Sequence, residues 1–327
     1  MSITAGQDIV TTDFINESER DATPANDAGR VPKLDADGSL SLDFLRDYSV
    51  RVKRTANLQL NALNVDEPIP WTAEDFDTDT MHATTEGTPY NETTNNAEET
   101  SNATTDWFAQ QFATGADQYA LGNILLYLRH TVDSSNSFEV VLRSSLTGSD
   151  LASSGVRAFD PASTAITAVN LRLSPYKLTP STTYYIVMKT MTFPASGTFV
   201  MRRNSAGSGG WRTDDSGVSW TAVTGGYVMT IGMNASSALI VPAAGKYLAI
   251  ANINCGTGAA RTIKLWKNNV VILGWVEGAG DNETGVSFSS LVELAESDFV
   301  SLTFNIASSS PNDILFEGSS FELIRFS

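Results

Sequence analysis

Hydrophobic and polar residues alternate along much of the chain, which is the pattern of β-strands with one buried face. The alternation begins with Leu40, Leu42 and Phe44 and continues through residues 50–60. Short apolar runs then recur at 124–128, 138–142, 169–173, 184–188, 247–253, 263–266, 270–273, 286–292, 299–306 and 321–326. Ser, Gly, Asn and Pro separate these runs, and no stretch keeps a helical period. The pattern therefore predicts an all-β fold built from antiparallel sandwiches.

Two polar segments interrupt this pattern. Residues 1–36 contain only short apolar islets, so they predict an extended N-terminal arm. Residues 83–105 contain almost no core-forming side chains and predict a polar linker or a long surface loop.

The charge is concentrated in the first third of the chain. The 327 residues carry a net charge of −16, and residues 1–110 hold 21 of the 37 acidic but only 7 of the 21 basic side chains. Nucleic acid is a poor partner for such a chain, because phosphate binding needs a clustered basic surface. The basic cluster of Arg46, Arg51, Lys53 and Arg54 alternates with valines, and we interpret it as a solvated strand face.

Cysteine and histidine are scarce. The single cysteine, Cys255, cannot form an internal disulfide, and we predict that it is a small buried hydrophobe. Two histidines are too few for most metal or triad chemistry, and His130 is predicted to be a surface or interface residue. The sequence contains no run of ~18 apolar residues, so a membrane-spanning helix is not expected. The first residues lack the basic and apolar regions of a secretory signal, so we expect a cytoplasmic protein or one exported without a standard leader.

Several carboxylates are candidate catalytic or cation-binding groups. Asp75, Asp77 and Asp79 alternate along one extended segment, and Asp214 and Asp215 are adjacent, so either set could supply the acid pair of a glycoside hydrolase. We favour loop solvation and turn capping for both sets.

A hard cation is a second possibility, with ligands from Asp35, Asp37, Asp77 and Asp79, although the spacing of an EF-hand is absent. We expect no catalytic residue, no metal ligand and no cofactor, and hence a protein that is not an enzyme.

Residues 213–220 fit the Asp-box pattern of β-hairpins. In this hairpin an aspartate side chain binds the amides of the turn and a tryptophan packs beneath it. Thr213, Asp215, Gly217 and Trp220 are the residues predicted to build it. Asp boxes occur in sialidases and in many proteins that are not enzymes, so we interpret this one as structural.

The C-terminal ninety or so residues resemble the jelly roll of the tumour-necrosis-factor and complement-globular-head family. The resemblance rests on segments found in the family's order, at residues 241–247, 263–269, 287–300 and 319–324. A stretch similar to the family's opening lies far upstream, at 57–64, 69–71 and 76–79. This resemblance implies one jelly roll assembled from residues 37–82 and 233–327. It also implies homotrimers, to which the apolar strand at 270–275 would contribute.

The segment between these two pieces, residues 106–232, resembles β-sandwich domains of bacterial surface and secreted proteins. Residues 107–115 are similar to the opening strand of those domains, and residues 178–187 to their turn-and-strand segment. The resemblance implies a second sandwich inserted into the first, which is physically tolerable because the cost of loop closure grows slowly with loop length.

The N-terminus resembles the start of bacteriophage fibre and other virion-attached proteins, through residues 3–9, 13–16 and 29–34. It implies a trimeric fibre or decoration protein on the virion surface, with Ile9, Val10, Phe14 and Ile15 docking into capsid, neck or tail proteins. The β-domains would then engage a host receptor or a surface glycan.

Trp211 and Trp275 are the candidate glycan contacts on those domains. The alternatives are an adhesin that is secreted or held on the bacterial surface or in the matrix, and, from the Asp-box analogy alone, a glycan-cleaving enzyme.

Overall fold

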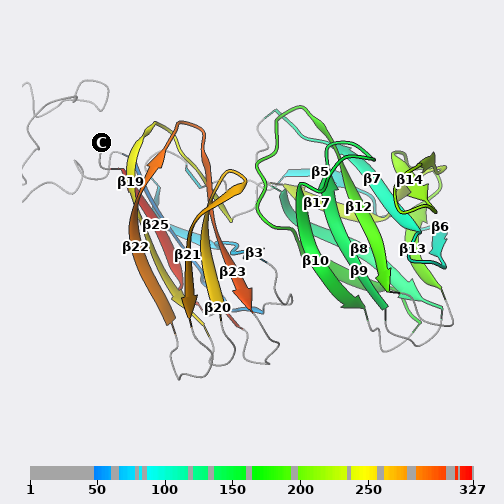
Figure 1. The fold of residues 1–327 in the computed structure, drawn as a ribbon, viewed down its shortest axis with the longest axis horizontal. Coiled ribbons are helices and arrows are strands. Elements are labelled where there is room, and N and C mark those ends of the chain that lie inside the picture. Colours follow the sequence, from blue (N-terminus) through cyan, green and yellow to red (C-terminus); the bar gives the residue numbers. More distant parts are fainter. Residues whose placement is uncertain are drawn as a thin grey trace, which may run out of the picture.

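The computed structural model describes residues 48–59, 66–77, 81–82, 87–116, 121–131, 136–159, 164–192, 198–233, 237–255, 261–277, 285–306, 314–315 and 317–325. These residues form strands and connecting turns and contain no helix, so the prediction of an all-β fold is confirmed for them. In particular, they include no helix that could cross a membrane. The strands group into two sandwiches, each with its own hydrophobic core (Figure 1).

The first sandwich combines strands from both ends of the described chain. One sheet has the order β22-β19-β25-β1-β4, with bounds Gly285–Leu294, Gly245–Asn254, Ser320–Arg325, Ser49–Lys53 and Ala73–Asp77. The other has the order β18-β23-β20-β21, with bounds Ala238–Ile240, Phe299–Ile306, Arg261–Lys267 and Val270–Glu277. Three short strands complete it: β3 (Glu67–Pro68) pairs with β23, and β2 (Leu58–Gln59) pairs with β24 (Ile314–Leu315).

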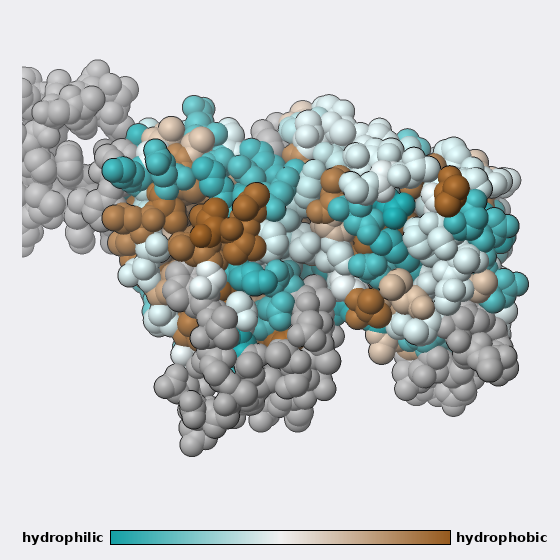
Figure 2. Space-filling view, in the orientation of Figure 1, coloured by the Kyte–Doolittle hydropathy of each residue, from teal (hydrophilic) through white to brown (hydrophobic). Residues whose placement is uncertain are grey.

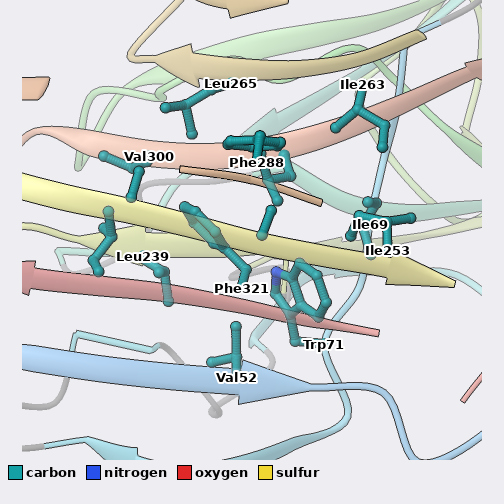
Figure 3. Close-up of a cluster of buried hydrophobic side chains, with 14 of the residues drawn as sticks. Val52, Ile69, Trp71, Leu239, Ile253, Ile263, Leu265, Phe288, Val300 and Phe321 are labelled. Atoms are coloured by element: carbon teal, nitrogen blue, oxygen red, sulfur yellow. The ribbon is translucent and has the colours of Figure 1, made fainter. Parts of the chain in front are cut away.

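β21 and β22 are the end strands of their sheets, and Figure 2 shows apolar surface over this side of the first sandwich. The core between the two sheets joins the early and the late segments of the sequence. Val52 and Trp71, from the early segment, are buried against strands that follow residue 238 (Figure 3). The Trp71 ring lies 6.2 Å from that of Phe321 on β25, with an interplanar angle of 26°. The early strands are therefore integral to this core.

The second sandwich is built from the intervening residues. One sheet has the order β10-β9-β12-β7-β14-β15, with bounds Ala152–Phe159, Asn136–Arg143, Thr183–Thr192, Trp107–Ala113, Gly210–Thr213 and Thr221–Ala222. The other has the order β16-β13-β8-β17-β5, with bounds Gly226–Tyr227, Phe199–Asn204, Leu121–His130, Met229–Met233 and Gly87–Asn91. β11 (Thr167–Arg172) pairs with β8, and β6 (Ala97–Ser101) pairs with β13.

The prediction of a polar linker at 83–105 is wrong, because β5 and β6 lie within this segment. Their polar composition suits edge strands, which bury little surface. β6 is also held by charge: Glu98 accepts from Arg129 at 2.6 Å, and Glu99 accepts from Arg212 at 2.7 Å. These arginines lie on β8 and β14, so sequence neighbours could not reveal the pairing.

The chain passes between the two sandwiches twice, at adjacent positions. Gly87 pairs with Met233 at one end of the second sandwich, and His82 forms a bridge to Leu239 in the first. An ion pair between Arg172 and Glu67, at 2.7 Å, also connects the two cores. The second sandwich is thus inserted into the first at a single place.

Candidate interaction surfaces

The Asp-box turn connects β14 to β15 and is fixed by one carboxylate. Asp215 accepts hydrogen bonds from the backbone nitrogens of Val218, at 3.0 Å, and Ser219, at 2.9 Å. The Thr213 hydroxyl donates to it at 2.5 Å. Hydrogen bonds from the Ser219 and Thr213 side chains, together with those turn amides, hold the pKa of Asp215 well below its usual range. The turn is therefore tied down by an ionised aspartate at neutral pH.

This turn packs against Trp107 on the outer side of the sheet. Gly217 has a φ of +88°, and a Cβ added to it would lie 2.8 Å from the Trp107 ring. The Gly217 carbonyl accepts from the Trp220 indole at 3.1 Å. Arg143 and Lys189 each place a cation 5.5 Å from the centroid of the Trp107 ring.

We call the surrounding surface the aromatic face; its half-buried members are Trp107, Leu146, Tyr185, Trp211 and Trp220. These side chains cover Ala109, Val141 and Val187, which are buried although they point away from the main core. Trp211 is half-buried, and the face therefore presents partly exposed aromatic side chains.

Charged groups beside the aromatic face are paired with one another. Arg143 donates to Asp150 at 2.8 Å, and Lys189 donates to Glu139 at 3.2 Å and also to Asp150. Burial raises the pKa of Asp150, but the hydrogen bonds from Lys189 and Arg143 outweigh it and the pKa is lowered. These cations are therefore already neutralised within the protein.

The structure places the candidate tryptophans in different sandwiches. Trp211 lies on β14, whereas the backbone of Trp275 lies on β21 of the first sandwich and its side chain is outside the described residues. The two do not form one site. Ile9, Val10, Phe14 and Ile15, the candidate attachment residues, also lie outside the described residues.

The described acidic residues near β4 have structural partners. Asp75 pairs with Lys53, and Asp77 accepts from the backbone nitrogens of Met81, at 2.9 Å, and His82, at 2.8 Å. Asp77 is therefore engaged by backbone amides four and five residues further along the chain. Over the described ranges of the chain, no group of three or more His, Cys, Asp or Glu side chains could hold a metal ion.

The prediction that His130 lies at the surface is wrong. Its ring is buried between Phe159, at 5.1 Å, and Phe199, at 5.6 Å, and its Nε2 lies 3.0 Å from the Asn136 amide oxygen. The sequence did carry a signal, because His130 continues the even-numbered positions of β8 that point inward. Cys255 is buried, as predicted.

The basic cluster is only partly solvated. Arg51 and Lys53 flank Asp75 at the surface, whereas Arg54 is 4% exposed and donates to backbone carbonyls, including that of Ala56 at 3.0 Å. Burial lowers the pKa of Arg54, with a further contribution from the charge of Arg172.

A second candidate surface lies on the first sandwich, and we call it the apolar strip. Val270 and Val271, at the start of β21, are 63% and 38% exposed, and Leu291 on β22 is 63% exposed. Leu291 stands beside Leu248 on β19, which stands beside Ile324 on β25. The sequence indicated the β21 part, but Leu291 lies on the serine-rich face of its strand, and only the strand pairing shows its apolar neighbours.

Fold and surfaces together define an all-β protein of two sandwiches with exposed apolar and aromatic surfaces. No protein-family model matches the chain, and no curated protein is significantly similar to it.

Proposed function

We propose that the protein is a trimeric virion protein, a bacteriophage fibre or decoration protein that attaches through its N-terminal arm and presents its β-sandwiches to the host. The strand order of the first sandwich supports the jelly-roll part of this proposal. Its first and last long strands, β1 and β25, are neighbours in one sheet, and the second sheet packs over them.

The observation that most strongly supports a trimer is the apolar strip. Leu291 and Val270, each 63% exposed, are large apolar side chains on end strands, and such surface favours association. The strip lies on one side of the sandwich, so it would meet a different surface of the next copy. Such a contact forms a closed ring when the rotation closes, and three copies would shield both the apolar side chains and the open strand edges.

The oligomeric state tests this part directly. Light scattering at micromolar concentration should give three times the monomer mass of 35.1 kDa for the unaltered chain. Leu291→Asp should give monomers, because it places a charge in the buried contact. Val218→Asp is the matched control, since Val218 is 77% exposed on the other sandwich and should leave the trimer intact. A stable monomer of the unaltered chain would refute the trimer.

Attachment and recognition need separate measurements. A chain lacking residues 1–36 should fold but fail to copurify with virus particles, whereas full occupancy of the particles would refute attachment by the arm. For the aromatic face, Trp211→Ala should weaken binding to host cells or to their surface glycans without changing the oligomer. Fractionation with bacterial cells in the absence of particles would instead favour the adhesin, and release of reducing sugar would favour the enzyme.

A further inference from the structure

One carboxylate of the first sandwich is hydrogen-bonded to both a lysine and an asparagine. Lys264 on β20 donates from Nζ to Asp66 at 2.8 Å, and Asn305 on β23 donates from Nδ2 to the other oxygen of Asp66 at 2.9 Å. β20 and β23 are neighbours, and their register sets Lys264 opposite Thr303 and Asn305 opposite Thr262. Because side chains alternate along a strand, Lys264 and Asn305 lie on the same side of the sheet, one diagonal step apart.

These three groups are partly shielded from water. The side chain of Asp66 is 16% exposed and that of Lys264 is 29% exposed. Thr303, which pairs with Lys264 on the neighbouring strand, is fully buried, and its hydroxyl accepts a hydrogen bond from the Trp266 indole at 2.8 Å. Asp66 accepts from both Lys264 and Asn305, so it is placed to take a proton from the lysine beside the amide. A neutral lysine amine is a nucleophile.

We propose that Lys264 and Asn305 form an isopeptide bond, with Asp66 as the acid–base group. A proton passes from the Lys264 ammonium to the Asp66 carboxylate, and the free Nζ attacks Cγ of the Asn305 carboxamide. Asp66 then passes this proton, and the second proton that Nζ loses as it becomes an amide nitrogen, to the departing nitrogen. The Nζ–Cγ bond forms, the Cγ–Nδ2 bond breaks, and the nitrogen leaves as ammonium, so Asp66 regains its negative charge and no oxidant or cofactor is consumed.

The cross-link would join two neighbouring strands, β20 and β23, through their side chains. It would add a covalent connection to the β20–β23 ladder and would oppose the separation of these strands. This inference goes beyond the proposed function and does not depend on it.

A second lysine in the same sandwich provides an internal comparison. Lys267 and Asn268 both contact Asp298, at 2.9 Å and 2.8 Å. These two residues are adjacent in sequence, and the Asn268 side-chain oxygen is engaged by the backbone nitrogen of Phe299 at 3.0 Å. A bond between them would link no pair of strands, so Lys267→Arg is a matched control.

The intact mass of the purified full-length protein tests the proposal. We expect it to fall below the sequence mass by one ammonia, and a proteolytic digest should yield one branched peptide containing Lys264 and Asn305. Lys264→Arg and Asp66→Ala should each restore the sequence mass while keeping the circular dichroism of a folded β-protein, and Lys267→Arg should retain the loss of ammonia. Lys264→Arg should also unfold at a lower temperature than the unaltered chain.

Two results would overturn the proposal. The first is an unaltered, folded protein at its full sequence mass. The second is an ammonia loss that persists in Lys264→Arg, which would assign the loss to another asparagine.

Discussion

Trp71 joins the two sequence segments of the first sandwich, and its removal tests that connection. The side chain is 1% exposed and stacks on Phe321. Trp71→Ala should cost about 3–5 kcal/mol, the usual range for deleting a buried aromatic ring with partial collapse of the cavity. A domain is typically stable by ~5–15 kcal/mol, so this loss is a large fraction of the total. Trp71→Phe should cost less than Trp71→Ala, because it keeps one aromatic ring in place and leaves a smaller cavity. Within the described residues the Trp71 indole nitrogen has no hydrogen-bond partner to lose.

Urea unfolding followed by hydrogen exchange of peptides from each core is the appropriate assay. Trp71→Ala should lower the midpoint for peptides of the first sandwich and leave the second unchanged. Phe138→Ala, at a residue 1% exposed in the other core, should do the reverse. Equal shifts of both sandwiches by Trp71→Ala would refute the division into two cores. No shift at all would refute the role of the early segment.

Three further predictions follow from named contacts. Replacing Glu98 and Glu99 together by glutamine should lower the free energy of unfolding by about 1 kcal/mol, because ion pairs near the surface contribute ~0.2–1 kcal/mol each. Hydrogen exchange at residues 97–101 should become faster. Unchanged exchange would show that charge does not hold β6. Gly217→Ala should destabilise the second sandwich by about 1–3 kcal/mol, because the added Cβ would meet the Trp107 ring and the residue has a positive φ. An unaltered melting temperature would contradict this. Because the folded-state pKa of Asp215 is depressed, its stabilisation of the turn is fully present above the unfolded pKa of ~4 and is lost as the pH falls through the folded value. Amide exchange in the turn, corrected for intrinsic rates, should therefore stay protected from pH 7 to about 4 and lose protection only in stronger acid, whereas Asp215→Asn should lack this dependence.

The parts of the fold that follow local rules could be predicted from the sequence. Short apolar runs between turn residues located β8, β9, β12 and the long strands of the first sandwich, because a strand is marked by the side chains of its own few residues. The Asp-box residues were also recognisable, since their contacts join residues only a few positions apart. β6 could not be predicted in this way, because the arginines that pair with its glutamates are distant in sequence.

The order of apolar and polar residues is enough to show that the chain forms strands, where most of them lie and which of their faces is apolar. Which of these faces become buried depends on how the strands pack together. His130 is a polar residue on the inward side of β8 and Leu291 is an apolar residue on the serine-rich side of β22, and the first is enclosed by Phe159 and Phe199 whereas the second is left open. The physical reason is that periodicity sets the direction in which a side chain leaves its own strand. Burial depends on whether side chains of the opposing sheet or of a neighbouring strand cover it there.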